Sequence, residues 1–322
     1  MRIYFCRQGL AYIRNGLQKE LPDDEVLDCA PEQVAEMAQQ ADVLIPTVSP
    51  IGPAAFTSPT LKLVQQYGAG LDSVDIPAAT QAGVYVANVP SAGTGNAESV
   101  AELSLFFMLA LARHYPRAQE SIAQKKLGTP MGRTLKGRTA AIIGYGGIGR
   151  EVARRLAGFE MDKILAISKR GPKDTPEENA VRVDFHGRLD DLHEVLGQAD
   201  FVIVAPPLND ETRGLIGPAE FARMKPGAFI INVARGPVLD YDAFVAALKD
   251  ERIAGAGLDV FWQEPFDPTD PIFSYNVIAT PHFGGATDLS LGGIGKRVAE
   301  NVNRVRHGQA PLNCANPSVT SF

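Results

Sequence analysis

Three side chains with complementary chemistry stand after three successive apolar runs in the C-terminal half of the chain. They are Arg235, Glu264 and His282, and each apolar run has the length and composition of a buried strand. Because ligands of open α/β sheets bind beyond the carboxyl ends of the strands, we expect these side chains to converge. Histidine exchanges a proton near neutral pH, and a carboxylate beside it favours its protonated form.

This set of side chains fits one reaction well. Hydride addition to a ketone leaves negative charge on the oxygen, and His282 is suited to supply the proton. Arg235 can clamp a neighbouring carboxylate through two hydrogen bonds and polarise the carbonyl beside it. The spacing therefore predicts reversible reduction of a 2-oxo acid to a 2-hydroxy acid. We expect no catalytic role for the remaining histidines, which have no partner indicated by spacing: His114, His186, His193 and His307.

A glycine-rich turn in the middle of the chain predicts where a dinucleotide binds. The apolar run at residues 140–143 leads into G-x-G-x-x-G, which is followed by a helical spacing of apolar residues. Gly144 permits a tight turn, Gly146 lets a pyrophosphate approach the backbone, and Gly149 lets the helix pack close to the strand. The N–H groups at the start of this helix attract the phosphates.

The end of the next apolar run favours NADP as the coenzyme. In dinucleotide-binding folds a carboxylate about 20 residues past the glycines binds the ribose hydroxyls. Here the run at residues 164–167 ends in Ser168, Lys169 and Arg170, and no acid stands there. Two cations and a hydroxyl can bind a 2′-phosphate that an acid would repel. The alternative is a solvated basic turn, with NAD bound through other contacts.

Short apolar runs alternate with helical patterns along the whole chain, which is typical of parallel sheets with helices on both faces. We expect the strands of a first sheet at residues 3–6, 43–46, 61–65 and 84–86. Those of a second sheet are expected at residues 140–143, 164–167, 201–205, 229–233, 254–258 and 277–279. Helical spacing is found at residues 149–158, 189–196 and 241–249.

Glycine- and proline-containing stretches at residues 90–96 and 284–292 are the expected hinges between two domains. The predicted fold class is α/β. We expect a Rossmann-type doubly wound domain that binds the dinucleotide at residues 98–287. A smaller flavodoxin-like substrate domain is expected to combine residues 1–97 with the helix-like segment 288–322.

Composition excludes several other classes of protein. The 322 residues are 45% hydrophobic and 21% charged, and a net charge of −6 argues against a dominant role in binding nucleic acid. Three scattered cysteines without a C-x-x-C pattern indicate neither a disulfide framework nor a metal site. No signal peptide is recognised, and the apolar segment 100–112 is too short for a membrane span, so we expect a cytoplasmic protein with this helix at an interface.

These motifs together resemble the D-isomer-specific 2-hydroxyacid dehydrogenase family over nearly the whole chain. Besides the glycine turn, the stretches that carry the resemblance are QYGAGLDSVD at 66–75, NAESVAE at 96–102, NVARG at 232–236, DVF followed by EP between 259 and 265, and PH at 281–282. The basic end of the run at 164–167 is similar to that of the NADP-using glyoxylate and hydroxypyruvate reductases.

The resemblance implies a role for each site residue. Arg235 would anchor the substrate carboxylate with help from the backbone around Ala69 and Gly70, and His282 would be the acid/base, with Glu264 as its partner. Asp259 would bind the nicotinamide carboxamide, and Val233 and Ala234 would line the ring. The expected coenzyme contacts are Gly144, Gly146, Gly147, Ile148, Gly149, Ser168, Lys169, Arg170, Pro207, Thr212, Val233, Ala234, Asp259, His282, Gly284 and Gly285.

The family is typically dimeric, and the apolar segment 100–112 suits the interface that its members use. Two departures from the family pattern concern the coenzyme. Gly147 stands where an arginine is frequent, and the sequence APP at 205–207 stands where many members have a histidine-containing turn. The adenosine side of the pocket is therefore expected to differ from that of many relatives.

Several functions remain open at this point. Glyoxylate and hydroxypyruvate are the first substrates expected, and pyruvate or bulkier oxo acids are alternatives. The same fold and triad also support phosphite oxidation and a non-catalytic, dinucleotide-sensing corepressor. Formate dehydrogenase is disfavoured because that relative has glutamine in place of Glu264, and a phosphoglycerate dehydrogenase is disfavoured by length.

Overall fold

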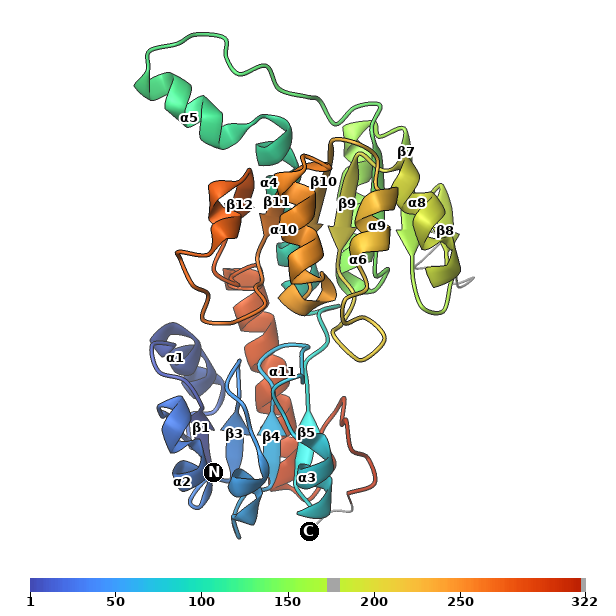
Figure 1. Cartoon of the computed structure of the whole chain (residues 1–322). Coiled ribbons are helices and arrows are strands. Elements are labelled where there is room, and N and C mark those ends of the chain that lie inside the picture. Colours follow the sequence, from blue (N-terminus) through green and yellow to red (C-terminus); the bar gives the residue numbers. More distant parts are fainter. Residues whose placement is uncertain (173–179, 320–322) are drawn as a thin grey trace. The chain divides into compact units, whose positions relative to one another are not determined.

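A computed structural model describes residues 1–172 and 180–319 of the chain. These residues form two compact units. One unit combines residues 1–96 with residues 286–322, and the other is the continuous segment 97–285 (Figure 1). Each unit contains a parallel sheet with helices packed against it, so the predicted α/β fold class is confirmed.

The described part of the smaller unit has five parallel strands in the order β2-β1-β3-β4-β5, which is the flavodoxin-like order. The strands are β1 (Arg2–Phe5), β2 (Glu25–Asp28), β3 (Val43–Ile45), β4 (Leu63–Gln65) and β5 (Tyr85–Ala87). The helices are α1 (Ala11–Glu20), α2 (Val34–Ala38), α3 (Ile76–Gln81) and α11 (Asp288–Arg306). The C-terminal helix α11 packs its apolar stripe, which includes Ile294, Val298 and Val302, into the same core as Ile3 and Phe5 of β1.

The described part of the larger unit has seven parallel strands in the order β12-β11-β10-β9-β6-β7-β8. The strands are β6 (Thr139–Ile143), β7 (Lys163–Ile167), β8 (Phe185–Gly187), β9 (Phe201–Val204), β10 (Ala228–Asn232), β11 (Ile253–Leu258) and β12 (Val277–Ala279). The helices are α4 (Asn96–Ala112), α5 (Tyr115–Ala123), α6 (Gly147–Leu156), α8 (Leu192–Gln198), α9 (Pro218–Arg223) and α10 (Tyr241–Lys249). This is the doubly wound Rossmann order with one further strand.

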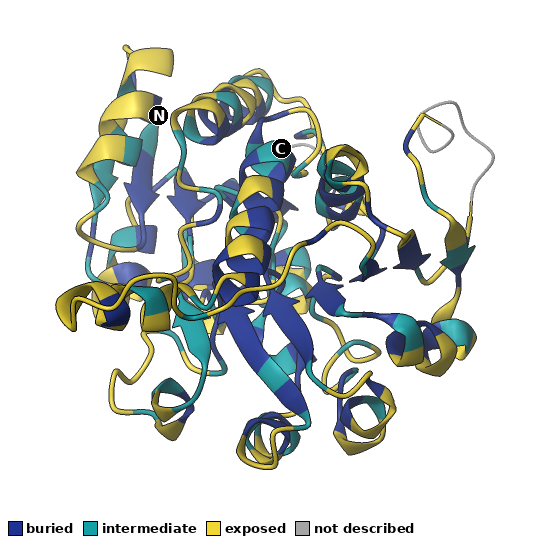
Figure 2. Cartoon of the chain, turned by 90° about the horizontal axis from the view of Figure 1, so that it is seen from above, coloured by how far each residue is buried: buried dark blue, intermediate teal, exposed yellow. Residues whose placement is uncertain are grey.

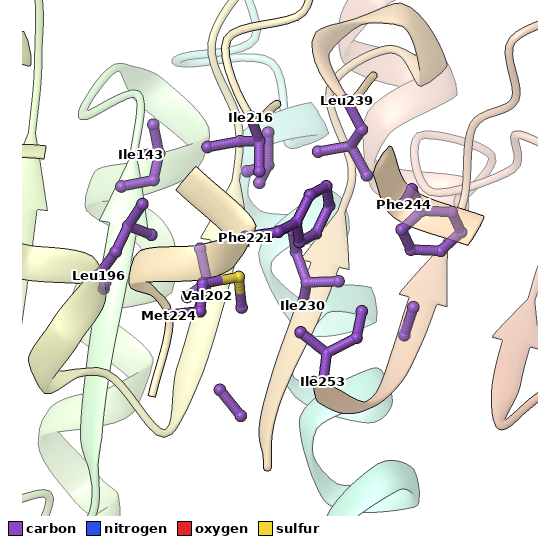
Figure 3. Packing of buried hydrophobic residues seen from close by; sticks show 14 of the residues in the cluster. Ile143, Leu196, Val202, Ile216, Phe221, Met224, Ile230, Leu239, Phe244 and Ile253 are labelled. Atoms are coloured by element: carbon purple, nitrogen blue, oxygen red, sulfur yellow. The ribbon is translucent and has the colours of Figure 1, made fainter. Parts of the chain in front are cut away.

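The larger sheet is buried on both faces, because successive residues of its strands enter two different cores. Ala141 and Ile143 of β6 pack with residues of α8, α9 and α10, as the close view in Figure 3 shows for Ile143. Ala140 and Ile142 pack on the opposite face with residues of α4 and α6. Figure 2 shows the result as strands that are almost entirely buried and helices with an exposed outer face.

The sequence analysis missed two strands, β2 and β8. Both lie at the edge of a sheet, and both are short and partly exposed. An edge strand needs no continuous apolar run, so the pattern that identified the central strands is absent from EVLD and FHG. Strand β8 carries His186.

Helix α4, which is expected at an interface, is mostly buried but has an exposed side. Glu102, Phe106 and Leu109 form an exposed stripe along it, and Glu102 pairs with Arg155 of α6 at 3.1 Å. In the part of the chain that the structure describes, no helix combines the length and the apolar character needed to cross a bilayer.

Candidate functional site

The order of the larger sheet reverses between β6 and β9, which is where doubly wound folds bind their ligands. Gly144 follows β6 with φ of +97°, a conformation that favours glycine. A side chain there would also place its Cβ 2.4 Å from the backbone nitrogen of Pro206, which follows β9. The turns after the two strands therefore lie in direct backbone contact at the reversal point.

The other two glycines of the motif serve different purposes. A Cβ at Gly149 would lie 2.4 Å from the carbonyl oxygen of Gly144, so α6 packs against the turn only because this residue has no side chain. Gly146 is exposed at the start of α6, and a Cβ there would meet no atom within 4 Å. An open backbone at a helix N-terminus beside the reversal point fits a dinucleotide pyrophosphate.

The turn after β7 presents a hydroxyl and two cations, and two of these three side chains have partners that the sequence did not indicate. Lys169 and Arg170 are both exposed, and Nζ of Lys169 lies 2.5 Å from a carboxylate oxygen of Glu211 in the loop after β9. The hydroxyl of Ser168 lies 2.8 Å from Nε2 of His186 on β8. Spacing along the sequence indicated no partner for His186, and the unrecognised strand β8 is what brings it beside Ser168.

A further cation lies near this turn that the sequence analysis did not single out. A Cβ at Gly171 would lie 3.0 Å from Nε of Arg188, so the Arg188 side chain packs against the backbone of the turn. Arg188 follows directly after β8. The signal that could have found it is a basic residue at the end of the third strand of the doubly wound sheet.

Two further residues expected at the coenzyme lie together in the loop after β9. Oγ1 of Thr212 donates to the carbonyl oxygen of Pro207 at 2.6 Å and accepts from the N–H of Asn209 at 2.9 Å. These two bonds connect the end of this loop to its beginning and so stabilise its conformation. Glu211, the partner of Lys169, belongs to the same loop.

Asn232 at the end of β10 shapes the segment that carries Arg235. The Asn232 amide is fully buried, donates to the carbonyl oxygen of Arg235 at 2.9 Å and accepts from the N–H of Ala234 at 3.0 Å. Val233 and Ala234 are buried, whereas the Arg235 side chain is half-buried. A Cβ at Gly236 would lie 2.0 Å from the carbonyl carbon of Phe261, so the segments after β10 and β11 touch through their backbones.

Asp259, at the end of β11, holds the segment that carries His282. Its side chain is buried, with 3% exposed. One carboxylate oxygen accepts from Oγ1 of Thr280 at 2.7 Å and from the N–H of Phe283 at 3.0 Å, and the other accepts from the N–H of Gly284 at 2.9 Å. Burial raises the pKa of Asp259, and these hydrogen bonds offset only part of that effect.

His282 and Glu264 form a close pair. Nδ1 of His282 lies 2.7 Å from one oxygen of the Glu264 carboxylate, whose other oxygen accepts from the N–H of Phe261 at 3.1 Å. Burial disfavours the charged form of Glu264, but the hydrogen bond and charge of His282, with help from Phe261 and Arg235, lower its pKa below the usual value. Glu264 is therefore a carboxylate at neutral pH, and it orients the imidazole of His282 through Nδ1.

The larger unit thus brings Arg235, Glu264 and His282 to the carboxyl edge of one sheet, together with the glycine turn. Ala69 and Gly70 belong to the smaller unit, in the loop after β4. Gly147 and Ile148 begin α6, and Gly285 ends the larger unit next to Gly284.

The other histidines lie apart from this set of side chains. Spacing indicated no partner for His193, but the fold brings its Nε2 to 2.8 Å from Glu220 on the surface of α8 and α9. His114, which its sequence context places on a helix, lies in the turn between α4 and α5. His307 follows α11 and contacts the carbonyl oxygen of Asn303 at 2.7 Å.

Comparison with known proteins identifies the family. Residues 105–284 match the family model for the NAD binding domain of the D-isomer specific 2-hydroxyacid dehydrogenases. The chain belongs to this family. A glyoxylate reductase from Thermococcus gammatolerans is 35% identical over 322 residues, covering 97% of this chain and 93% of the relative.

Other relatives of this dehydrogenase differ in length and in stated activity. A D-3-phosphoglycerate dehydrogenase from Archaeoglobus fulgidus is 37% identical over 80% of this chain but only 48% of its own length. Among solved structures, an NADPH-dependent glyoxylate/hydroxypyruvate reductase from Sinorhizobium meliloti, in complex with NADP and malonate, superimposes with a TM-score of 0.83. It is 26% identical and the match covers 100% of this chain and 98% of that protein.

Proposed function

We propose that this dehydrogenase reduces a small 2-oxo acid, with glyoxylate and hydroxypyruvate as the first candidates, to the D-2-hydroxy acid with NADPH. The observation that carries the proposal is the 2.7 Å contact between His282 and Glu264 at the carboxyl edge of the sheet. A glyoxylate reductase that aligns with nearly the whole chain supports the substrate class.

The protein side of the reaction follows from these contacts. Glu264 accepts the Nδ1 proton of His282, which leaves the Nε2 proton for the oxygen of the substrate carbonyl. Arg235 binds the substrate carboxylate and stabilises the charge that develops on the carbonyl oxygen. The nicotinamide, when bound, supplies the hydride. In oxidation of the hydroxy acid, neutral His282 takes the hydroxyl proton back.

Each of the two units has its own role in binding. The unit at residues 97–285 binds the dinucleotide through the glycine turn and the start of α6. The unit that includes Ala69 and Gly70 contributes backbone N–H groups to the substrate carboxylate. Asp259 keeps the His282 segment in place, and its remaining lone pairs are available to the nicotinamide carboxamide.

Turnover is the test of the proposed activity. Purified protein is assayed with NADPH and NADH against glyoxylate, hydroxypyruvate, pyruvate and bulkier 2-oxo acids, and in the oxidative direction against phosphite. We expect steady NADPH oxidation with a small 2-oxo acid, and a loss of at least about 100-fold in kcat for His282→Ala. His193→Ala is the matched control, since it removes an imidazole that also pairs with a glutamate but lies elsewhere.

Other outcomes would replace the proposal. Phosphite oxidation without reduction of any 2-oxo acid would assign the alternative chemistry. Tight binding of a dinucleotide without turnover of any compound would assign a sensor. Equal loss of activity in His193→Ala and His282→Ala would show that the His282 pair has no special role.

NADPH preference is the second prediction. Arg170 is exposed near Ser168, Arg188 packs against the same turn, and Lys169 beside them is paired with Glu211, so this turn offers cations to a 2′-phosphate. Arg170→Ala should lower kcat/KM for NADPH by about tenfold and leave the value for NADH nearly unchanged, because only NADPH carries the phosphate. Arg182→Ala, which removes an exposed cation elsewhere in the same unit, is the control. A wild-type preference for NADH would remove this inference.

A further inference from the structure

A buried amide closes the loop that is proposed to bind the substrate carboxylate. Gln66 follows β4 in the smaller unit, and only 5% of it is exposed. Its Nε2 donates to the carbonyl oxygen of Gly70 at 2.7 Å and to that of Thr47 at 2.9 Å, and its Oε1 accepts from the N–H of Tyr67 at 2.9 Å. One side chain therefore holds both ends of the loop and ties it to the loop after β3.

The other carbonyl groups of this loop are also held. The N–H of Val89 donates to the carbonyl oxygen of Gly68 at 2.8 Å, and Nδ2 of Asn88 donates to that of Ala69 at 2.7 Å. With the bond at Gly70, three successive carbonyl groups have a fixed donor.

Fixing the carbonyl groups also fixes the N–H groups. The carbonyl of one residue and the N–H of the next belong to one planar peptide and point in opposite directions. The bonds at Gly68, Ala69 and Gly70 therefore turn the N–H groups of Ala69, Gly70 and Leu71 away from their donors. Within the described ranges 1–172 and 180–319, the N–H groups of Ala69 and Gly70 donate to no acceptor of the protein.

We propose that Gln66, supported by Asn88, is a positioning residue that pre-organises these N–H groups for the carboxylate of the 2-oxo acid. Gly68, with φ of +147°, gives the loop a backbone conformation that residues with side chains rarely adopt, and successive oriented N–H groups form a concave anion site. The inference rests on the proposed function of the loop. Gln66 acts through the backbone and does not itself touch the substrate.

The structure supplies a matched control for a merely structural role. Asn316 is another buried amide of the same unit, with 4% exposed. It accepts from the N–H of Val86 at 2.8 Å, and donates to the carbonyl oxygen of Val84 at 2.9 Å and to Thr80 at 3.1 Å. Its loss should lower stability as the loss of Gln66 does, but none of its bonds reaches residues 66–71.

The experiment compares Gln66→Met and Asn316→Leu, two changes that remove an amide and nearly keep its volume. Each variant is measured for melting temperature, for kcat and KM with the preferred 2-oxo acid, and for the Kd of oxalate in the presence of the oxidised coenzyme. Gln66→Met should raise KM and the Kd of oxalate together by about tenfold, because ionic hydrogen bonds are weakened. Its kcat and coenzyme Kd should stay within about twofold of wild type, since the carboxylate is bound equally in ground and transition states.

The outcomes separate the two proposals. Unchanged KM and oxalate affinity in Gln66→Met, with a fall in melting temperature like that of Asn316→Leu, would overturn the positioning role. If Gln66→Met does not fold, Asn88→Ala at a half-buried position must show the same rise in KM, or the inference fails. A wild-type chain whose oxalate affinity depends on Gln66 but that reduces no 2-oxo acid would refute the proposed activity alone, and one that neither binds oxalate nor reduces a 2-oxo acid would refute both.

Discussion

The contacts of His282 show how much local structure is devoted to one imidazole. His282 has φ of +53°, a conformation that non-glycine residues adopt at some cost. Asp259 compensates by binding Thr280 on one side of it and the N–H groups of Phe283 and Gly284 on the other. Glu264 contacts Nδ1 of the ring, so the backbone conformation of His282 and the tautomer of its ring are both fixed before any ligand binds.

The charge of Glu264 should set the pH range of reduction. Protonated His282 is the required form in reduction, so kcat/KM for the 2-oxo acid should decline at high pH. Glu264→Gln removes the negative charge that favours the imidazolium, so this decline should begin at a lower pH. The measurement is the pH profile of kcat/KM. Glu220→Gln, which removes the partner of His193, should leave the profile in place.

The same carboxylate links pH to stability. The pKa of Glu264 is lower in the folded protein than its ordinary value, so its contribution to stability is present above that ordinary value. That contribution is lost as the pH falls through the lowered pKa. If the pH profile of kcat/KM were the same in Glu264→Gln and in the wild type, the proposed electrostatic role of Glu264 would be contradicted.

Residue types and spacing were enough to single out Arg235, Glu264 and His282, because each stands in the segment that follows a strand of the larger sheet, namely β10, β11 and β12. They were not enough for His186, which faces Ser168 through the register between β7 and β8. Gln66 was passed over for a related reason. Its partners, Thr47 and Gly70, come together only when β3 and β4 are paired, and a sequence pattern does not contain that pairing.

Among the elements, the turn between β6 and α6 depends most on its glycines. Gly149 is in contact with the carbonyl of Gly144, and Gly144 in turn is in contact with Pro206, so strand, helix and neighbouring loop are packed backbone to backbone. Gly146 takes no part in this packing. The motif therefore contains two glycines that the fold requires, and we propose that the third is required by the coenzyme.

Two alanine substitutions should separate these requirements. Gly149→Ala should destabilise the protein by about 1–3 kcal/mol, because a methyl group would lie against the carbonyl of Gly144 and α6 must move. Gly146→Ala should leave the melting temperature nearly unchanged but weaken coenzyme binding at least about tenfold, because the methyl group occupies space for the pyrophosphate. Thermal unfolding and coenzyme titration measure the two effects. Equal effects of both variants on coenzyme binding at equal stability would argue against this division.

Central strands and long helices were predictable from their apolar patterns, and the helix at Tyr241–Lys249 has the bounds expected. The edge strands β2 and β8 were not, since an edge strand that buries one face and spans a few residues resembles a loop. The segment 100–112 was expected at an interface, and since Phe106 and Leu109 of α4 are exposed in the single chain, that expectation stays a prediction.

At the scale of the whole molecule, the exposed apolar residues of α4, α5 and the segment after them need a partner. We propose that a second copy of this chain covers them, as the family resemblance implies. The residues concerned are Phe106, Leu109, Tyr115, Ile122, Leu127 and Met131, of which Leu127 is 97% exposed.

Charge placed on this surface should split the proposed dimer. The double variant Phe106→Asp with Ile122→Asp should sediment as a monomer at concentrations where the wild type is a dimer, because two carboxylates would be buried without partners. Tyr12→Asp, a change at an exposed aromatic residue of α1, should remain dimeric. A wild-type chain that is monomeric at all concentrations in sedimentation analysis would contradict the proposal.

The larger unit is a continuous segment inserted into the smaller one, and this has a consequence for how the protein is made. During synthesis, residues 97–285 emerge complete and can fold while the ribosome is still adding the remainder. Strands β1 to β5 must wait, because α11 supplies one wall of their core and is translated only after the whole of the larger unit. Residues 1–96 therefore have an uncovered apolar surface until α11 has been made, and this is the stage at which a chaperone would be needed most.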